Sequence, residues 1–141
     1  MMDSSGIDEH EQVIKLLTGD PYAAMEAAKK LIKIHQQVNP ESLIRVLEDH
    51  ARHPWSRIAA AYVLGFLDYG PSNSGAKALL RVLENSKERV SLRSHAAEAL
   101  GNLGATEAIS VLREVLQDPE ESKTLQKWCK FALSELKSGS K

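Results

Sequence analysis

The sequence lacks several features that would place it in a special class of protein. It contains a single cysteine, Cys129, so it has no internal disulfide framework, and this fits a reducing compartment. Aromatic residues make up only 5% of the chain. No apolar run approaches the roughly 20 residues that a membrane-spanning helix needs, and the polar N-terminus is not a secretory signal. We therefore expect a cytoplasmic protein that does not interact with membranes.

Neither sign of charge is in excess. The chain of 141 residues carries 18 lysines and arginines against 19 aspartates and glutamates, a net charge of -1. A dedicated nucleic-acid-binding protein usually shows a basic excess. The composition argues against a nucleic-acid partner, and the length suits one domain with a core of its own.

Two helical stripes recur four times along the chain. One stripe has the spacing i, i+4, i+7 and the other i, i+3, i+4, and both spacings place residues on one face of an α-helix. The first stripe comprises Ala27/Leu31/Ile34, Ala60/Leu64/Leu67, Ala96/Leu100/Leu103 and Cys129/Leu133/Leu136. The second comprises Val13/Leu16/Leu17, Leu43/Val46/Leu47, Leu79/Val82/Leu83 and Leu112/Val115/Leu116. Such periodicity predicts a tandem array of helical hairpins, each with an A helix and a B helix.

Prolines and glycines punctuate the same pattern. Asp20-Pro21, Asn39-Pro40 and Asp118-Pro119 each place a capping side chain before a proline at the first helical position. Gly19, Gly70 and Gly104 fall between stripes, where helices should end. The predicted helices span about residues 8–18, 21–36, 40–52, 54–68, 74–85, 89–103, 105–117 and 119–137. No period-2 alternation of apolar residues predicts a strand.

The predicted fold is all-α: an α-solenoid of about eight helices, in which antiparallel pairs stack into a right-handed superhelix. We expect one domain over residues 8–137, between disordered tails at 1–7 and 138–141. Its predicted units are a half-unit at 8–18, full units at 20–52, 53–85 and 86–117, and a capping half-unit at 118–137. Lys130 replaces the small residue of the earlier units, as suits a helix with no neighbour beyond it.

The repeat units resemble HEAT repeats, in particular the short phycobilisome-lyase type. The resemblance rests on Arg57…Ala60-Ala61…Leu64-Gly65, on Arg93…Ala96-Ala97…Leu100-Gly101, and on the acidic-proline pair Asp118-Pro119. It covers residues 11 to 137, and it departs from the pattern in the first unit and the last. In that family the repeat arginine commonly ties adjacent units through a carboxylate or a carbonyl, which implies a structural role for Arg57 and Arg93.

No motif for catalysis, cofactor binding or metal binding stands out. His50 and His53 have the i, i+3 spacing that could begin a metal site, but no nearby ligand completes the set. Cys129 occupies a small-residue position of the stripe, which favours a buried thiol over a nucleophile. We therefore predict no catalytic residue, no cofactor and no metal ligand.

The surface of the predicted B helices offers a binding ridge. Solenoids use extended concave surfaces for binding, and a mixture of charges suits a protein partner. Tyr69 belongs to the segment DYGPSNSGA, which is three residues longer than the matching segments. The predicted partner-binding residues are Arg45, Glu48, Lys77, Arg81, Glu84, Glu114 and Tyr69.

Three functions follow as hypotheses. The first is a non-enzymatic protein-interaction module, acting as a scaffold, adaptor or inhibitor whose B helices bind another protein. The second is an accessory subunit similar to phycobilisome lyases, which act on bilin chromophores. The third is a HEAT-like DNA glycosylase, which the absence of a basic excess disfavours.

Overall fold

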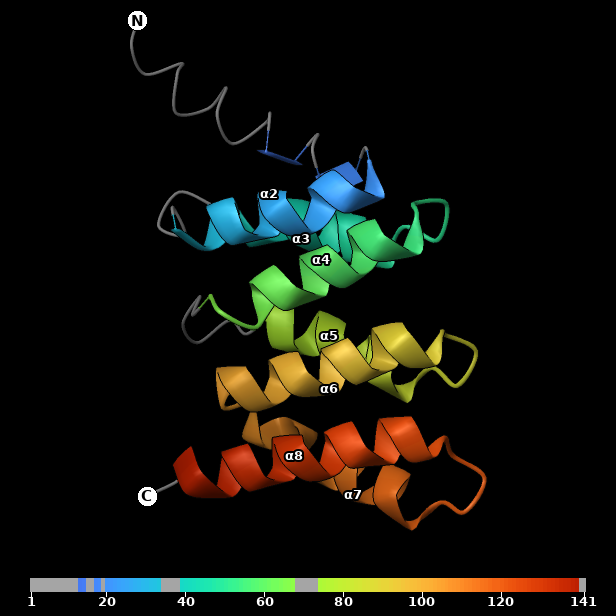
Figure 1. Ribbon diagram of the computed structural model, residues 1–141. Coiled ribbons are helices and arrows are strands. Elements are labelled where there is room, and N and C mark those ends of the chain that lie inside the picture. Colours follow the sequence, from blue (N-terminus) through green and yellow to red (C-terminus); the bar gives the residue numbers. More distant parts are fainter. Residues whose placement is uncertain (1–12, 15–16, 19, 34–38, 68–73, 140–141) are drawn as a thin grey trace, which may run out of the picture.

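The computed structural model is a stack of helix pairs (Figure 1). It describes residues 13–14, 17–18, 20–33, 39–67 and 74–139, and no β-strand occurs among them. This confirms the predicted all-α solenoid. The helices are α2 (Pro21–Lys33), α3 (Pro40–Glu48), α4 (Pro54–Leu64), α5 (Ser74–Glu84), α6 (Val90–Leu103), η3 (Thr106–Ala108), α7 (Ile109–Gln117) and α8 (Lys123–Gly139).

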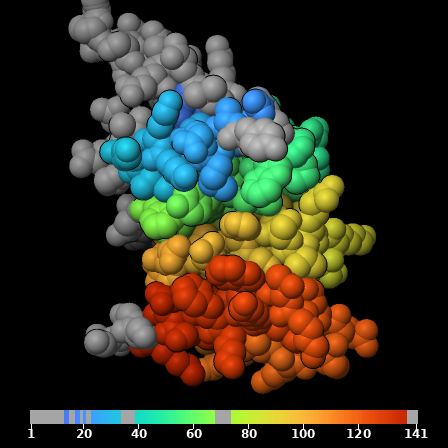
Figure 2. Space-filling model, viewed as in Figure 1, coloured from blue at the N-terminus to red at the C-terminus, as the bar shows by residue number. Residues whose placement is uncertain are grey.

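The helices form two layers. Helices α2, α4, α6 and α8 pack side by side in sequence order and form the A layer, while α3, α5 and α7 form the B layer. Each B helix packs on the A helix that follows it: α3 on α4, α5 on α6 and α7 on α8. The space-filling view shows the successive units as bands of colour down the stack (Figure 2).

The repeating stripes meet in the core between the layers. The small residues Ala27, Ala60, Ala96 and Cys129 are buried, as the pattern predicts. Leucines one turn later fill the seam between helices, and Leu31, Leu64 and Leu100 are fully inaccessible to solvent. Lys130 is exposed on α8 at the end of the stack.

Several helix ends differ from the prediction. The predicted helix 54–68 ends at Leu64, and the predicted helix 105–117 begins with the short 3-10 helix η3. The predicted start at Pro119 is wrong, because Asp118 Oδ1 accepts the Glu120 N–H at 2.9 Å in a turn and α8 begins at Lys123. Ser122 caps α8 instead, through a hydrogen bond of 3.1 Å from the Thr124 N–H to its Oγ.

Other boundaries agree with the sequence. Asn39 Oδ1 accepts the Glu41 N–H at 2.9 Å and caps α3, and Gly104 ends α6 at a φ of 70°, a left-handed conformation that favours glycine. The predicted helix 8–18 is described only at residues 13–14 and 17–18, which are helical. Gly19, Gly70 and Tyr69 lie outside the described residues, as does most of the longer segment.

Candidate functional site

Charged side chains cover the free face of the B layer. Arg45 on α3, Lys77 and Arg81 on α5, and Glu114 on α7 are all exposed. Glu48 and Glu84, at the C-terminal ends of α3 and α5, are exposed as well. The structure therefore places the six described residues of the predicted ridge on three successive B helices.

Two open pockets lie between successive units on this face. The first pocket has a volume of about 210 Å³ and is lined by Glu48, His50, Arg57, Arg81, Val82, Asn85 and Glu88. The second pocket has a volume of about 290 Å³ and is lined by Leu83, Glu84, Arg93, Val111, Glu114, Val115, Asp118 and Glu121. Four residues of the predicted ridge line these pockets, whereas Arg45 and Lys77 line neither.

A buried arginine forms one wall of each pocket. The Arg57 guanidinium donates two hydrogen bonds to the Glu88 carboxylate, at 3.0 and 2.6 Å, and its Nε donates to the Leu47 carbonyl at 2.8 Å. The Arg57 and Glu88 side chains are only 7% and 6% exposed. Because Leu47 belongs to α3 and Glu88 follows α5, this cluster ties neighbouring units together.

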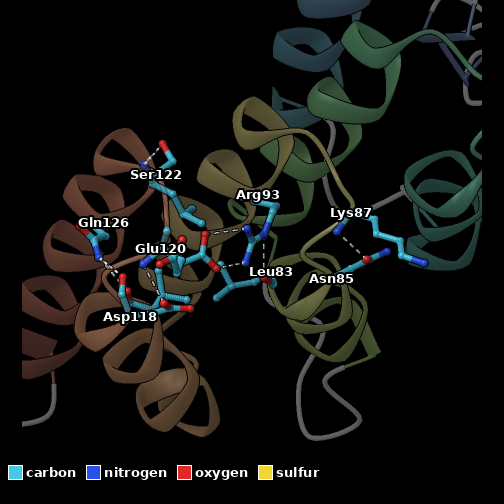
Figure 3. Close-up of polar contacts among 11 residues, drawn as sticks. Leu83, Asn85, Lys87, Arg93, Asp118, Glu120, Ser122 and Gln126 are labelled. Carbon is cyan, nitrogen blue, oxygen red and sulfur yellow. Dashed lines mark hydrogen bonds and ion pairs between the residues drawn. The ribbon is translucent and has the colours of Figure 1, made fainter.

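The same cluster recurs one unit later. Arg93 donates to the Glu121 carboxylate at 3.0 and 2.9 Å, and its Nε donates to the Leu83 carbonyl at 2.9 Å (Figure 3). In the last unit Gln126 Nε2 donates to the Val115 and Asp118 carbonyls instead, at 3.1 and 2.8 Å. The structural role that the resemblance implied for Arg57 and Arg93 agrees with these contacts.

The clusters make the stability of the protein dependent on pH. The hydrogen bonds from Arg57 and Arg93 hold the pKa values of Glu88 and Glu121 below their ordinary value of 4.5. A carboxylate whose pKa is lower in the folded state stabilises that state above its unfolded pKa, and the effect is lost as the pH falls through the folded pKa.

We therefore predict that the contribution of these two pairs to the free energy of unfolding is constant from pH 7 to about pH 5 and declines below about pH 4.5 as the carboxylates take up protons. Urea titrations monitored by circular dichroism across this range would measure it. In the Glu88→Gln/Glu121→Gln double variant the decline should be shallower. An equally steep decline in that variant would assign the acid sensitivity to other carboxylates.

The two pockets occupy equivalent positions in the repeat but carry different charges. Glu48, Arg57, Val82 and Glu88 of the first pocket correspond to Glu84, Arg93, Val115 and Glu121 of the second. Arg81 corresponds to Glu114, and Asn85 corresponds to Asp118. The first pocket therefore pairs two carboxylates with two guanidinium groups, whereas the second pairs four carboxylates with one.

The histidines and the cysteine that the sequence offered as candidate ligands or nucleophile make contacts that stabilise the fold or are buried in it. His53 Nδ1 accepts the Trp55 N–H at 3.1 Å and caps α4, while His50 Nδ1 lies 3.6 Å from Glu88 Oε2. Burial raises the pKa of the Cys129 thiol to about 12, so this side chain stays protonated at neutral pH. Among the residues that the structure describes, no group of three or more His, Cys, Asp or Glu side chains could hold a metal ion.

Sequence reasoning missed Glu88, Asp118 and Glu121 as pocket residues. Asn85 with Glu88, and Asp118 with Glu121, have the spacing of capping boxes, which is typical of local roles at helix starts. The glutamates pair with arginines of the preceding A helix instead. The signal was available in the repeat itself, because each arginine and its glutamate recur together in successive units.

The described helices are all too short or too polar to span a membrane. The longest of them, α8, has 17 residues and is strongly charged.

Comparisons with known proteins identify the repeat and its relatives. Residues 41–134 match the family model for HEAT repeats, which supports the repeat type but does not distinguish the phycobilisome-lyase type. Deoxyhypusine hydroxylase-B from rice, Oryza sativa subsp. japonica, is 40% identical over 80 residues. That match covers 57% of this chain and 25% of the rice protein, so this chain spans about a quarter of its relative.

The fold is also found in a solved structure. Human deoxyhypusine hydroxylase in complex with glycerol superposes with a TM-score of 0.70 at 20% sequence identity. The superposition covers 96% of this chain and 46% of the human protein. Nearly all of this chain therefore has the fold of somewhat less than half of that structure.

These relatives correct the functional prediction. The expectation of a non-enzymatic scaffold, adaptor or inhibitor is wrong, because the rice relative and the human structural neighbour are both enzymes by name. The resemblance to HEAT repeats identified the type of repeat, but it did not reveal the similarity to deoxyhypusine hydroxylases. HEAT repeats occur in scaffolds and enzymes alike, and a fold does not by itself specify a function.

Proposed function

This chain belongs to the HEAT-repeat family, and from that premise we propose that it acts in a hydroxylase-type enzyme whose substrate is a lysine-derived side chain of a protein. The support in sequence is the 40% identity to the rice deoxyhypusine hydroxylase. Deoxyhypusine is an amino acid built on lysine, and its extended side chain carries amines. Because this chain spans only part of both relatives, we transfer the class of reaction and the class of substrate alone.

The acidic second pocket is the observation that carries the proposal. Its carboxylates come from Glu84, Glu114, Asp118 and Glu121, and Arg93 is its one basic side chain. An amine with an ordinary pKa near 10.4 is protonated at neutral pH, so it enters such a pocket as a cation. A protein that acts on an amine-bearing side chain needs this kind of complementary surface.

The apolar part of the pocket matches the rest of such a side chain. Leu83, Val111 and Val115 line the pocket beside the carboxylates. The methylene groups of a lysine-type side chain pack on apolar surface while its amine remains near polar groups. In this proposal the described residues bind the substrate side chain and hold it in one orientation, so that its reacting carbon lies in a defined position.

The chemistry of oxygen insertion requires more than these residues. Enzymes that hydroxylate a C–H bond with dioxygen use a cofactor such as non-haem iron, haem or flavin. A metal cofactor needs several His, Cys, Asp or Glu ligands within reach of one another, and the described residues offer no such group of three. They do not fit a metal centre, so we assign to the described part of the chain the binding of the substrate alone.

The proposal is tested by following oxygen into a substrate. The enzyme isolated from native cells through this chain, together with the subunits and cofactor that copurify, would be incubated with a deoxyhypusine-bearing protein, a reductant and isotopically labelled dioxygen, and the product analysed by mass spectrometry. We expect the mass gain of one labelled oxygen atom on the modified lysine. The same protein with an unmodified lysine is the control and should gain none.

The Glu114→Gln variant links this activity to the second pocket. Loss of one carboxylate should raise KM for the substrate by about threefold to tenfold while kcat changes less, because a charge contact at a pocket rim contributes about 1 kcal/mol. An unchanged substrate mass with the isolated wild-type enzyme would overturn the proposed activity.

A further inference from the structure

We infer that Glu114 determines the specificity of the second pocket, and that the residue at this repeat position, arginine or glutamate, decides whether a pocket between units accepts a cationic side chain. The inference rests on the proposed function, from which it takes only the lysine-type substrate. It concerns which side chain a pocket binds, so a binding experiment can test it without any hydroxylation.

The two pockets provide an internal comparison because most of their framework is the same. Each contains a clustered arginine, its glutamate partner, a valine of the B helix and a glutamate at the end of the preceding B helix. Arg81 and Glu114 occupy the same position on α5 and α7. Their exchange therefore changes the charge of a pocket within a constant architecture.

In the first pocket, Arg81 neutralises the glutamate beside it. Arg81 Nε and Nη2 donate to Glu48 Oε2 at 3.1 and 2.6 Å, and the two side chains are 60% and 41% exposed. Arg57 is held by Glu88 and by a backbone carbonyl. A cationic ligand would have to compete with Arg81 for Glu48, so this pocket has no carboxylate available for it.

In the second pocket, the corresponding cation is absent. Glu84 corresponds to Glu48, but the position of Arg81 holds Glu114, so both of these pocket positions are acidic. Arg93 donates to Glu121 and to the Leu83 carbonyl, as Arg57 does in the first pocket. A protonated amine would supply, at this position, the charge that Arg81 supplies one unit earlier.

The lining of the second pocket favours an amine on an aliphatic chain over a bare metal ion. Its cavity of about 290 Å³ is lined by Leu83, Val111 and Val115 as well as by acidic residues. Among the described residues, these carboxylates do not form a group that could hold a metal ion. A compact divalent ion needs closely placed oxygen ligands, whereas a lysine-type side chain needs apolar walls and a carboxylate at one end.

Two charge exchanges test the inference, with N-acetyl-lysine N-methylamide as the probe and NMR chemical shifts of backbone amides as the readout. In the wild-type protein we expect shifts at the second pocket only. Glu114→Arg should weaken this binding about tenfold or more, because the new arginine can pair with Glu84 as Arg81 pairs with Glu48. Arg81→Glu should create a second site at the first pocket, with shifts around Val82 and Asn85.

Matched controls separate the local effect from net charge. Glu98→Arg on α6 makes the same change in net charge on the A layer, away from both pockets, and should leave binding unchanged. The Nε-acetylated probe has lost its charge and should bind no variant. Circular dichroism would show that each variant keeps its helices.

Each outcome of these titrations decides the inference. Undiminished binding by Glu114→Arg, equal weakening by Glu98→Arg, or no new site in Arg81→Glu would overturn it. Binding that follows the pattern above without any hydroxylation would support the specificity of Glu114 and overturn only the proposed activity.

Discussion

Replacing Glu88 with alanine is expected to lower the free energy of unfolding by about 3–5 kcal/mol, because it leaves a buried arginine without its carboxylate. The Arg57 side chain is 7% exposed, and its two Nη atoms both donate to Glu88. Only the bond from Nε to the Leu47 carbonyl would remain. Removal of one partner of a buried pair costs far more than the intact pair contributes, because the remaining charge keeps its desolvation cost.

Chemical denaturation of Glu88→Ala would measure this loss, and Glu48→Ala provides a matched control. Glu48 also pairs with an arginine through a contact of 2.6 Å, but it is 41% exposed, so we expect its loss to cost at most about 1 kcal/mol. The Arg57→Met/Glu88→Met double variant should recover much of the stability, since it removes both buried charges. Equal losses in the two single variants would show that burial does not set the strength of the Arg57–Glu88 pair.

Much of the fold could be predicted because a repeat provides several independent readings of one pattern. The stripes that contain Ala60 and Leu64, or Ala96 and Leu100, predicted which residues are buried, and the structure buries all four. The helix period and the stop at Gly104 were also readable, since both depend on local backbone geometry.

The pockets could not be predicted because they depend on contacts between distant parts of the chain. Glu88 and Glu121 could cap a local helix or pair with an arginine of the preceding unit, and their sequence spacing fits both roles. The three-dimensional structure shows that the pairing role is the one adopted, since each glutamate contacts an arginine about thirty residues earlier in the chain. The reversal of charge at Arg81 and Glu114 was visible in the sequence, but it acquires meaning only once both residues line a pocket.

The arginine clusters connect the stability of the array to the shape of its pockets. Glu121 lines the second pocket and pairs with Arg93, which in turn holds the end of α5 through the Leu83 carbonyl. Glu84 directly follows Leu83 and lines the same pocket. The positions of the carboxylates that line the second pocket therefore depend on a buried contact between units, so disruption of Arg93 should affect both unfolding and the proposed binding of a cationic side chain.

Replacing Gly65 with alanine is expected to lower the free energy of unfolding by about 1–3 kcal/mol, because α4 and α6 approach too closely for another methyl group. A Cβ atom at Gly65 would lie 2.8 Å from both Cα and Cβ of Ala99. One of these contacts is with backbone, so a change of rotamer cannot relieve it and the helices must move apart. Alanine's better helix propensity offsets up to about 1 kcal/mol of this cost.

Gly75→Ala is the matched control, because it makes the same chemical change in α5 with more room. Its nearest neighbour would be the flexible end of the Leu64 side chain, Cδ2, at 3.3 Å, so we expect unchanged or slightly increased stability. Gly101→Ala should fall between the two, since its Cβ would lie 3.0 Å from Ala132 Cα. Thermal unfolding of the three variants should rank them in this order, and a Gly65→Ala protein as stable as Gly75→Ala would show that the α4–α6 contact tolerates a wider spacing.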